Sequence, residues 1–198
     1  MTMKYELTDE TKQYAGRTLH RIRRLSSGEL GGWVESQYNL SQKGSCWVDD
    51  EAMVFGKAQV FGKALVFGKA QVFGKAHVFG KAHVSGKSCV FGEACVYGEA
   101  CVYGKAHVSG EARVYGEACV YGEACVQFAT NKSPLFLSGL RWYVTLGPGV
   151  IQIGCEFHPV SAWESFSDDV IASMDEDALE FWREHRSMIL HMAKENDE

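Results

Sequence analysis

The sequence predicts a mainly β fold in which short strands wind into a solenoid of stacked coils. Valine recurs every sixth residue, thirteen times in succession, from Val54 to Val126. Most of these valines begin the same unit of valine, aromatic, glycine, charged residue, alanine and a variable residue, as in residues 54–59. A short repeat that stays in phase over about 70 residues is typical of a solenoid, because each unit can bury its apolar side only against its neighbours.

Residues 1–45 are expected to form a small N-terminal β cap. Polar and apolar side chains alternate over residues 5–8 and 18–22, which predicts two short strands. Residues 31–35 begin with two glycines and indicate a turn into a further strand. The open end of a solenoid exposes unpaired strand edges, so a cover of this kind is needed there.

The repeat proper covers residues 46–127, and its period of six explains a triangular coil. Side chains alternate along a strand, so alanine and valine share one side while the variable residue and the aromatic share the other. Glycine and the charged residue turn the corner, where glycine is free to adopt a positive φ. Three such sides close a coil of 18 residues, and about four to five coils fit in the segment. Each buried valine is worth roughly 1.5–3 kcal/mol.

Residues 128–198 are expected to form an α/β segment that caps the other end. A β-hairpin is predicted over residues 140–153 around the tight turn 147–149, and a short helix over residues 161–173. Asp175 is suited to cap a longer helix. That helix carries one apolar stripe: Ala178, Phe181, Trp182, His185, Met188, Ile189 and Met192.

Composition excludes several classes of function. A net charge of −5 argues against a nucleic-acid binder, which would be basic. No apolar run follows the N-terminal charges and no stretch approaches 18 consecutive apolar residues, so we expect a cytoplasmic protein without membrane contact. Five of the seven cysteines occupy one position of the repeat, which indicates drift of that position rather than a disulfide framework.

The repeat resembles the hexapeptide repeat of left-handed parallel β-helix proteins. The flanking segments GELGGWVE at residues 28–35, NLS at 39–41 and GSCWV at 44–48 are similar to the opening of uncharacterised bacterial and bacteriophage hexapeptide-repeat proteins, some of which are labelled transferases. The tail from IGC at 153–155 to EFW at 180–182 resembles phage members. The resemblance implies left-handed coils. A phage origin would further imply action on a host protein or immune signal.

Residues 18 apart should stack, so the outer surface can be divided into columns. One face alone carries an unbroken column of rings beside a histidine and an arginine: Phe61, Phe79, Tyr97, Tyr115, His77 and Arg113. Four stacked rings make an apolar patch that is large for a monomer, and such a patch favours a partner or self-association surface. The alternative is that the rings only stiffen the coil or lie under a terminal segment. We therefore predict a non-catalytic interaction module that forms homo-oligomers.

The corners carry a charge gradient. Lysines come first along the chain: Lys57, Lys63, Lys69, Lys75, Lys81 and Lys87. Glutamates follow, with Lys105 out of order: Glu93, Glu99, Glu111, Glu117 and Glu123. Antiparallel packing would set lysine against glutamate, so we favour an antiparallel dimer over the parallel trimer of hexapeptide enzymes. The gradient would have no role if these charges are simply solvated.

Two other functions remain open. Hexapeptide acyltransferases, which this repeat resembles, use a histidine near an inserted loop and acyl-CoA between subunits. Here the repeat has no inserted loop, and His77, His83 and His107 fall on three different faces, so an enzyme is not favoured. Outside that alternative no cofactor is expected. The other function is binding of a nucleotide or small ligand between subunits, with Arg113 or the corner lysines facing the anion.

Metal binding is only weakly indicated. Two columns combine zinc-compatible residues: His83, Cys101 and Cys119 in one, and Cys89, His107 and Cys125 in the other. Coils stack about 4.8 Å apart, so two ligands of a column could share an ion but the third could hardly reach it. Cys155 and His158 form a single C-x-x-H pair that we interpret as structural. The stacked thiols of Cys101 and Cys119 are expected to form a disulfide on oxidation.

Overall fold

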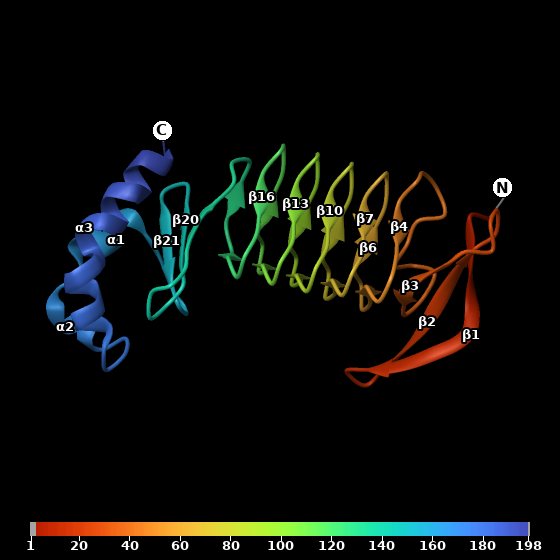
Figure 1. Cartoon of the computed structure of the whole chain (residues 1–198), viewed down its shortest axis with the longest axis horizontal. Coiled ribbons are helices and arrows are strands. Elements are labelled where there is room, and N and C mark those ends of the chain that lie inside the picture. Colours follow the sequence, from red (N-terminus) through yellow and green to blue (C-terminus); the bar gives the residue numbers. More distant parts are fainter. Residues whose placement is uncertain (1–2, 198) are drawn as a thin grey trace. The chain divides into compact units, whose positions relative to one another are not determined.

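The computed structural model describes residues 3–197, which fall into two compact units, Met1–Ser133 and Pro134–Glu198. The first unit is a parallel β-solenoid of about five coils, and the second combines a small antiparallel sheet with helices (Figure 1). The predicted mainly β fold with stacked coils is therefore confirmed. Among the described residues, no helix is both long and apolar enough to cross a membrane.

An antiparallel hairpin opens the first unit. Strand β1 (Tyr5–Tyr14) pairs with β2 (Arg17–Arg24), and β2 pairs with β3 (Leu30–Val34). Strand β3 in turn runs parallel to β5 (Met53–Val54), so the hairpin continues one sheet of the solenoid. The two strands predicted at residues 5–8 and 18–22 are present, and β1 is longer than predicted.

Three parallel sheets form the sides of the coils, and each of the strands β4 to β18 has two residues. The first sheet contains β6 (Gln59–Val60), β9 (His77–Val78), β12 (Cys95–Val96), β15 (Arg113–Val114) and β18 (Ala129–Thr130). The second contains β5, β8 (Gln71–Val72), β11 (Cys89–Val90), β14 (His107–Val108) and β17 (Cys125–Val126). The third contains β4 (Trp47–Val48), β7 (Leu65–Val66), β10 (His83–Val84), β13 (Cys101–Val102) and β16 (Cys119–Val120).

The interior of the coils is lined by the repeated valine and alanine. Every valine of the repeat from Val54 to Val126 is at most 1% exposed, while the aromatic residues point outward. The corner glycines have φ between 65° and 76°. A Cβ on Gly80 would lie 2.9 Å from the backbone nitrogen of Gly98 in the next coil. At Gly80, therefore, both the backbone conformation and the stacking of coils require glycine.

The stacking register continues beyond the strict repeat but with a change of phase at each end. Leu40 pairs with Val60, 20 residues later (60 − 40), instead of 18. Thr130 pairs with Val114, only 16 residues earlier (130 − 114). The first coil thus has two extra residues and the last has two fewer.

The second unit is a four-stranded antiparallel sheet with three helices. The strands, in sheet order, are β19 (Leu135–Leu137), β20 (Val144–Gly147), β21 (Val150–Ile153) and β22 (Glu156–Pro159). The helices are α1 (Val160–Ser165), α2 (Asp168–Ala172) and α3 (Ala178–Asp197). The predicted hairpin is present, although its first strand begins at Val144 instead of residue 140.

Two helix predictions need correction. The single helix expected over residues 161–173 is wrong, because Ser167 interrupts it and caps α2 by accepting a hydrogen bond from the Val170 nitrogen. Of the predicted stripe, Phe181, Trp182 and Ile189 are buried, but Met188 is 42% exposed. Met188 lies at the edge of the helical arc, and the unpredicted Ala193 completes the buried side instead.

Candidate interaction face

Four rings stack along one side of the solenoid, which we call the ladder face. It comprises strands β6, β9, β12 and β15 and the ring residue that follows each of them: Phe61, Phe79, Tyr97 and Tyr115. Successive ring centroids are 4.8, 4.8 and 5.4 Å apart, with interplanar angles of 2°, 4° and 9°. Each ring covers the faces of its neighbours and leaves its own edge exposed, so all four are half-buried. The predicted column is therefore formed.

A second row of side chains runs beside the rings. Gln59, His77, Cys95 and Arg113 occupy neighbouring coils in register, as predicted. The imidazole of His77 packs edge-on against Phe61 at a centroid distance of 6.3 Å. The ladder face thus presents ring edges beside a row of mostly polar groups on a hydrogen-bonded sheet.

The other two faces do not offer the same surface. On the face of β5, β8 and β11, Phe55 and Phe73 stack at 5.1 Å, but Phe55 is only 7% exposed because Tyr14 of the hairpin packs against it. The Tyr14 hydroxyl also donates to Gln71 on this face, at 3.0 Å. On the face of β7, β10 and β13, Ser85 interrupts the ring column.

The corner charges form columns, each with one change of sign. The two columns that flank the ladder face contain Lys57, Lys75, Glu93 and Glu111, and Lys63, Lys81, Glu99 and Glu117. The third contains Lys69, Lys87, Lys105 and Glu123. Lys105, which is out of order along the chain, therefore extends the lysine run of its own column by one coil.

A salt bridge marks each change of sign. Lys75 and Glu93 are 2.6 Å apart, as are Lys81 and Glu99 on the other flank of the ladder face. The hydrogen bond and charge of Glu93 raise the pKa of Lys75, and those of Lys75 lower the pKa of Glu93. Both groups are fully exposed, so each of these pairs contributes little to the stability of the fold.

The weak metal candidates stack in register without forming a metal cluster. His83 lies beside Cys101, which lies beside Cys119; Cys89, His107 and Cys125 align likewise on another face. Among residues 3–197, no three His, Cys, Asp or Glu side chains are placed to hold an ion. Burial raises the pKa of the Cys89, Cys101 and Cys125 thiols.

The three histidines of the described coils lie apart from one another. His77, His83 and His107 lie on three different sheets, as predicted, and the strands follow one another from β5 to β17 without an inserted loop. In the second unit, His158 pairs with Glu156 at 2.9 Å, and Cys155 is exposed.

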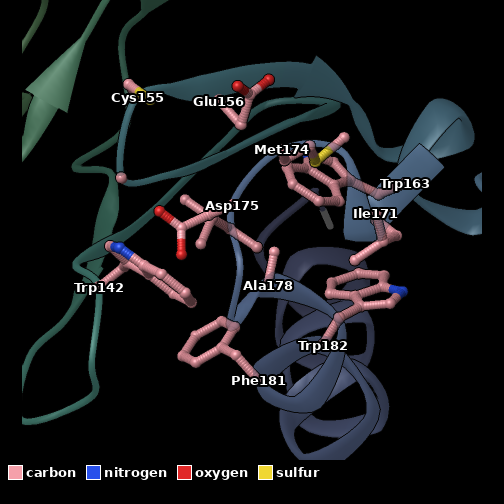
Figure 2. Close-up of a pocket in the computed structure, with 12 residues that line it drawn as sticks. Trp142, Cys155, Glu156, Trp163, Ile171, Met174, Asp175, Ala178, Phe181 and Trp182 are labelled. Carbon is pink, nitrogen blue, oxygen red and sulfur yellow. The ribbon is translucent and has the colours of Figure 1, made fainter. Parts of the chain in front are cut away.

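One feature of the second unit could not be predicted. A pocket of about 70 Å³ is lined by several aromatic rings and two carboxylates, chiefly Trp142, Trp163, Phe181, Trp182, Glu156 and Asp175 (Figure 2). These residues come from the start of β22, from α1 and α3, and from the segments before β20 and α3. No protein-family model and no curated protein matches this chain.

Proposed function

We propose that the chain is a non-catalytic interaction module and that its ladder face binds a second copy of the same chain. The unbroken column of half-exposed rings from Phe61 to Tyr115 carries this proposal. Backbone hydrogen bonds join every coil to the next, as from Phe61 to Val78 and from Phe79 to Val96. The rings are therefore presented on a rigid support, and little conformational entropy would be lost on binding.

The flanking charges favour one orientation of the two copies. If the ladder faces meet in an antiparallel dimer, each flanking column faces its own reversed copy. Lys57 then lies opposite the partner's Glu111, and Lys63 opposite the partner's Glu117. In a parallel dimer, Lys57 would instead lie opposite the partner's Lys63. Exposed opposite-charge pairs are each worth only about 0–1 kcal/mol, but like charges in contact oppose the parallel arrangement along the whole face.

The size of the face limits the affinity. Four coils spaced about 4.8 Å apart, with a side about 15 Å wide, give roughly 300 Å² for each copy. A standard protein interface buries about 800 Å² on each partner. A dimer held by this face alone should therefore be weak, in the micromolar range or above, and it should weaken further with salt because its orientation depends on exposed charges.

Zero-length carbodiimide cross-linking tests this arrangement. Lys57 and Glu111 of one chain are three coils apart, about 14 Å, which is too far for a direct amide bond. An equal mixture of ¹⁴N- and ¹⁵N-labelled protein should therefore give mixed-label peptides that join Lys57 to Glu111 and Lys63 to Glu117. A trimer in sedimentation analysis, with neither cross-link formed, would refute the antiparallel dimer.

The finer classification is also a proposal. The six-residue unit and the flanking segments support membership of the left-handed hexapeptide-repeat type found in bacteria and bacteriophages. A host protein would then compete with the second copy for the ladder face. The enzymatic alternative is tested by measuring the Tm of the protein with and without acetyl-CoA. A marked rise in Tm would favour an acyltransferase, and an unchanged Tm would favour the interaction module.

A further inference from the structure

The pocket of the second unit has a rigid aromatic wall. Trp163, Phe181 and Trp182 are at most 6% exposed. The Trp163 and Trp182 ring centroids are 5.0 Å apart, and the Trp163 indole N–H donates to the Ile151 carbonyl at 3.0 Å. Trp142 completes the wall, edge-on to Phe181 at 5.0 Å. The rings are therefore held in place by the protein and need no ligand to order them.

Trp142 reaches this position because Gly154 leaves room for it. A Cβ at Gly154 would lie 3.2 Å from the Cδ1 atom of Trp142, and its φ of 56° also favours glycine. The glycine is in the turn between β21 and β22, and the pocket carboxylate Glu156 is the first residue of β22. This turn therefore accommodates one ring of the pocket and leads directly into one of its acidic groups.

The charges that line the pocket are negative. Glu156 and Asp175 are lining residues, and among residues 3–196 no lysine, arginine or histidine lines the pocket (Figure 2). Glu156 pairs with His158. Asp175 accepts a hydrogen bond from the Asp177 nitrogen at 3.1 Å and makes no ion pair with any residue that the structure describes. Asp175 is therefore the carboxylate available to balance a positive ligand.

Two of these rings already contact cations. The guanidinium of Arg141 lies 5.1 Å from the Trp142 centroid and is paired with Asp177, and that of Arg186 lies 5.9 Å from the Trp182 centroid. Neither arginine lines the pocket. Their positive charge would repel a cation bound in the pocket, so a carboxylate in the pocket lining becomes more important for such a ligand.

We propose that this pocket binds a methylated ammonium group, such as the head group of choline. Aromatic walls favour a cation that is itself apolar at its surface, through cation–π attraction. The two carboxylates oppose anions. A metal ion would need closely placed ligands, and no such group of three is present among the described residues. A volume of about 70 Å³ suits one small head group, whereas pockets for drug-sized ligands and cofactors occupy about 300–1,000 Å³.

Intrinsic fluorescence gives a direct assay, because three of the five tryptophans line the pocket. The full chain is titrated with choline chloride at constant ionic strength, and in parallel with 3,3-dimethylbutan-1-ol, which has the same shape without the charge. We expect saturable quenching by choline in the millimolar range and at least tenfold weaker binding of the neutral alcohol. Equal affinities, or no response up to about 50 mM choline, would overturn the proposal.

Two variants locate the binding. Asp175→Asn removes the charge without changing shape, and Trp142→Leu keeps an apolar wall without a ring. Each should weaken choline binding about tenfold and leave the binding of the neutral alcohol unchanged. Glu176→Gln is the matched control, since it removes an exposed neighbouring charge outside the pocket. If Trp142→Leu fails to fold, Asp175→Asn remains the test. Choline affinity that is unchanged in Asp175→Asn would refute the role given to the carboxylate.

Discussion

Alanine substitution of two stacked glycines separates the two reasons why the corners of the coils require glycine. Gly92 has a φ of 74°, and a Cβ there would lie 2.9 Å from both the nitrogen and the oxygen of Gly110 in the next coil. Gly110 has a similar φ of 65°, but a Cβ on it would meet nothing within 4 Å. The two positions therefore have the same backbone cost and different packing.

Gly110→Ala should lose only the energy of a left-handed backbone, about 1–2 kcal/mol. Gly92→Ala should lose that amount and, in addition, about 1–3 kcal/mol for the backbone shift that the new methyl group forces. The expected total for Gly92→Ala is therefore roughly 2–5 kcal/mol.

Urea unfolding of both variants, followed by circular dichroism, gives the two free energies. The m-value must stay constant, because a solenoid can lose cooperativity when one coil is weakened. A second pair of alanine variants, at Gly80 and Gly116, controls for differences between positions. A Cβ on Gly80 would lie 2.9 Å from the backbone of Gly98, whereas a Cβ on Gly116 would have no atom closer than 3.6 Å. Equal losses within both pairs would show that the coils are not packed as closely as the register requires.

Three further outcomes are expected. Tyr97→Arg should weaken self-association at least tenfold in sedimentation velocity, while Tyr103→Arg, on a different face, should not; equal effects would disprove a specific ladder face. The lysine partner Lys75 lowers the pKa of Glu93, so the pair should stabilise the folded chain above about pH 4.5, the ordinary pKa of a glutamate. This contribution should disappear as the pH falls through the lowered pKa. A normal pKa for Glu93 in a carboxyl NMR titration would contradict the salt bridge. Diamide, which accepts the two electrons and two protons of the thiols, should form a disulfide between Cys101 and Cys119. The reaction should be slow at neutral pH and faster towards pH 9, because burial first and then the neighbouring thiol raise the pKa of Cys101 above 9.0. Peptide mapping detects the disulfide, and a Cys119→Ser variant should lack it.

Much of the solenoid could be predicted because each repeat position has one physical task. Valine and alanine fill the interior, glycine turns the corner, and the ring faces outward, so a period of six determines both the strands and the 18-residue register. The phase changes were harder to predict. Leu40 and Thr130 take interior positions without being valine, and the coils they belong to differ in length from the rest.

The second unit was less predictable because its signals are short and not repeated. Strands β19 and β22 contain three and four residues without clear alternation. Ser167 is compatible with the interior of a helix by sequence, yet it caps one instead. The lining of the aromatic pocket is drawn from separate segments between Trp142 and Trp182, and their proximity depends on tertiary packing that no local pattern encodes.

The hairpin before the first coil has a consequence for polymerisation. A solenoid of constant period has two ends that match, so further chains could add to it indefinitely, as in a fibril. Here β2 already pairs antiparallel with β3, so the hairpin occupies the sheet edge to which the last strand of an identical neighbour would otherwise add. Growth of this sheet along the axis is therefore disfavoured, without any need for charged gatekeeper residues.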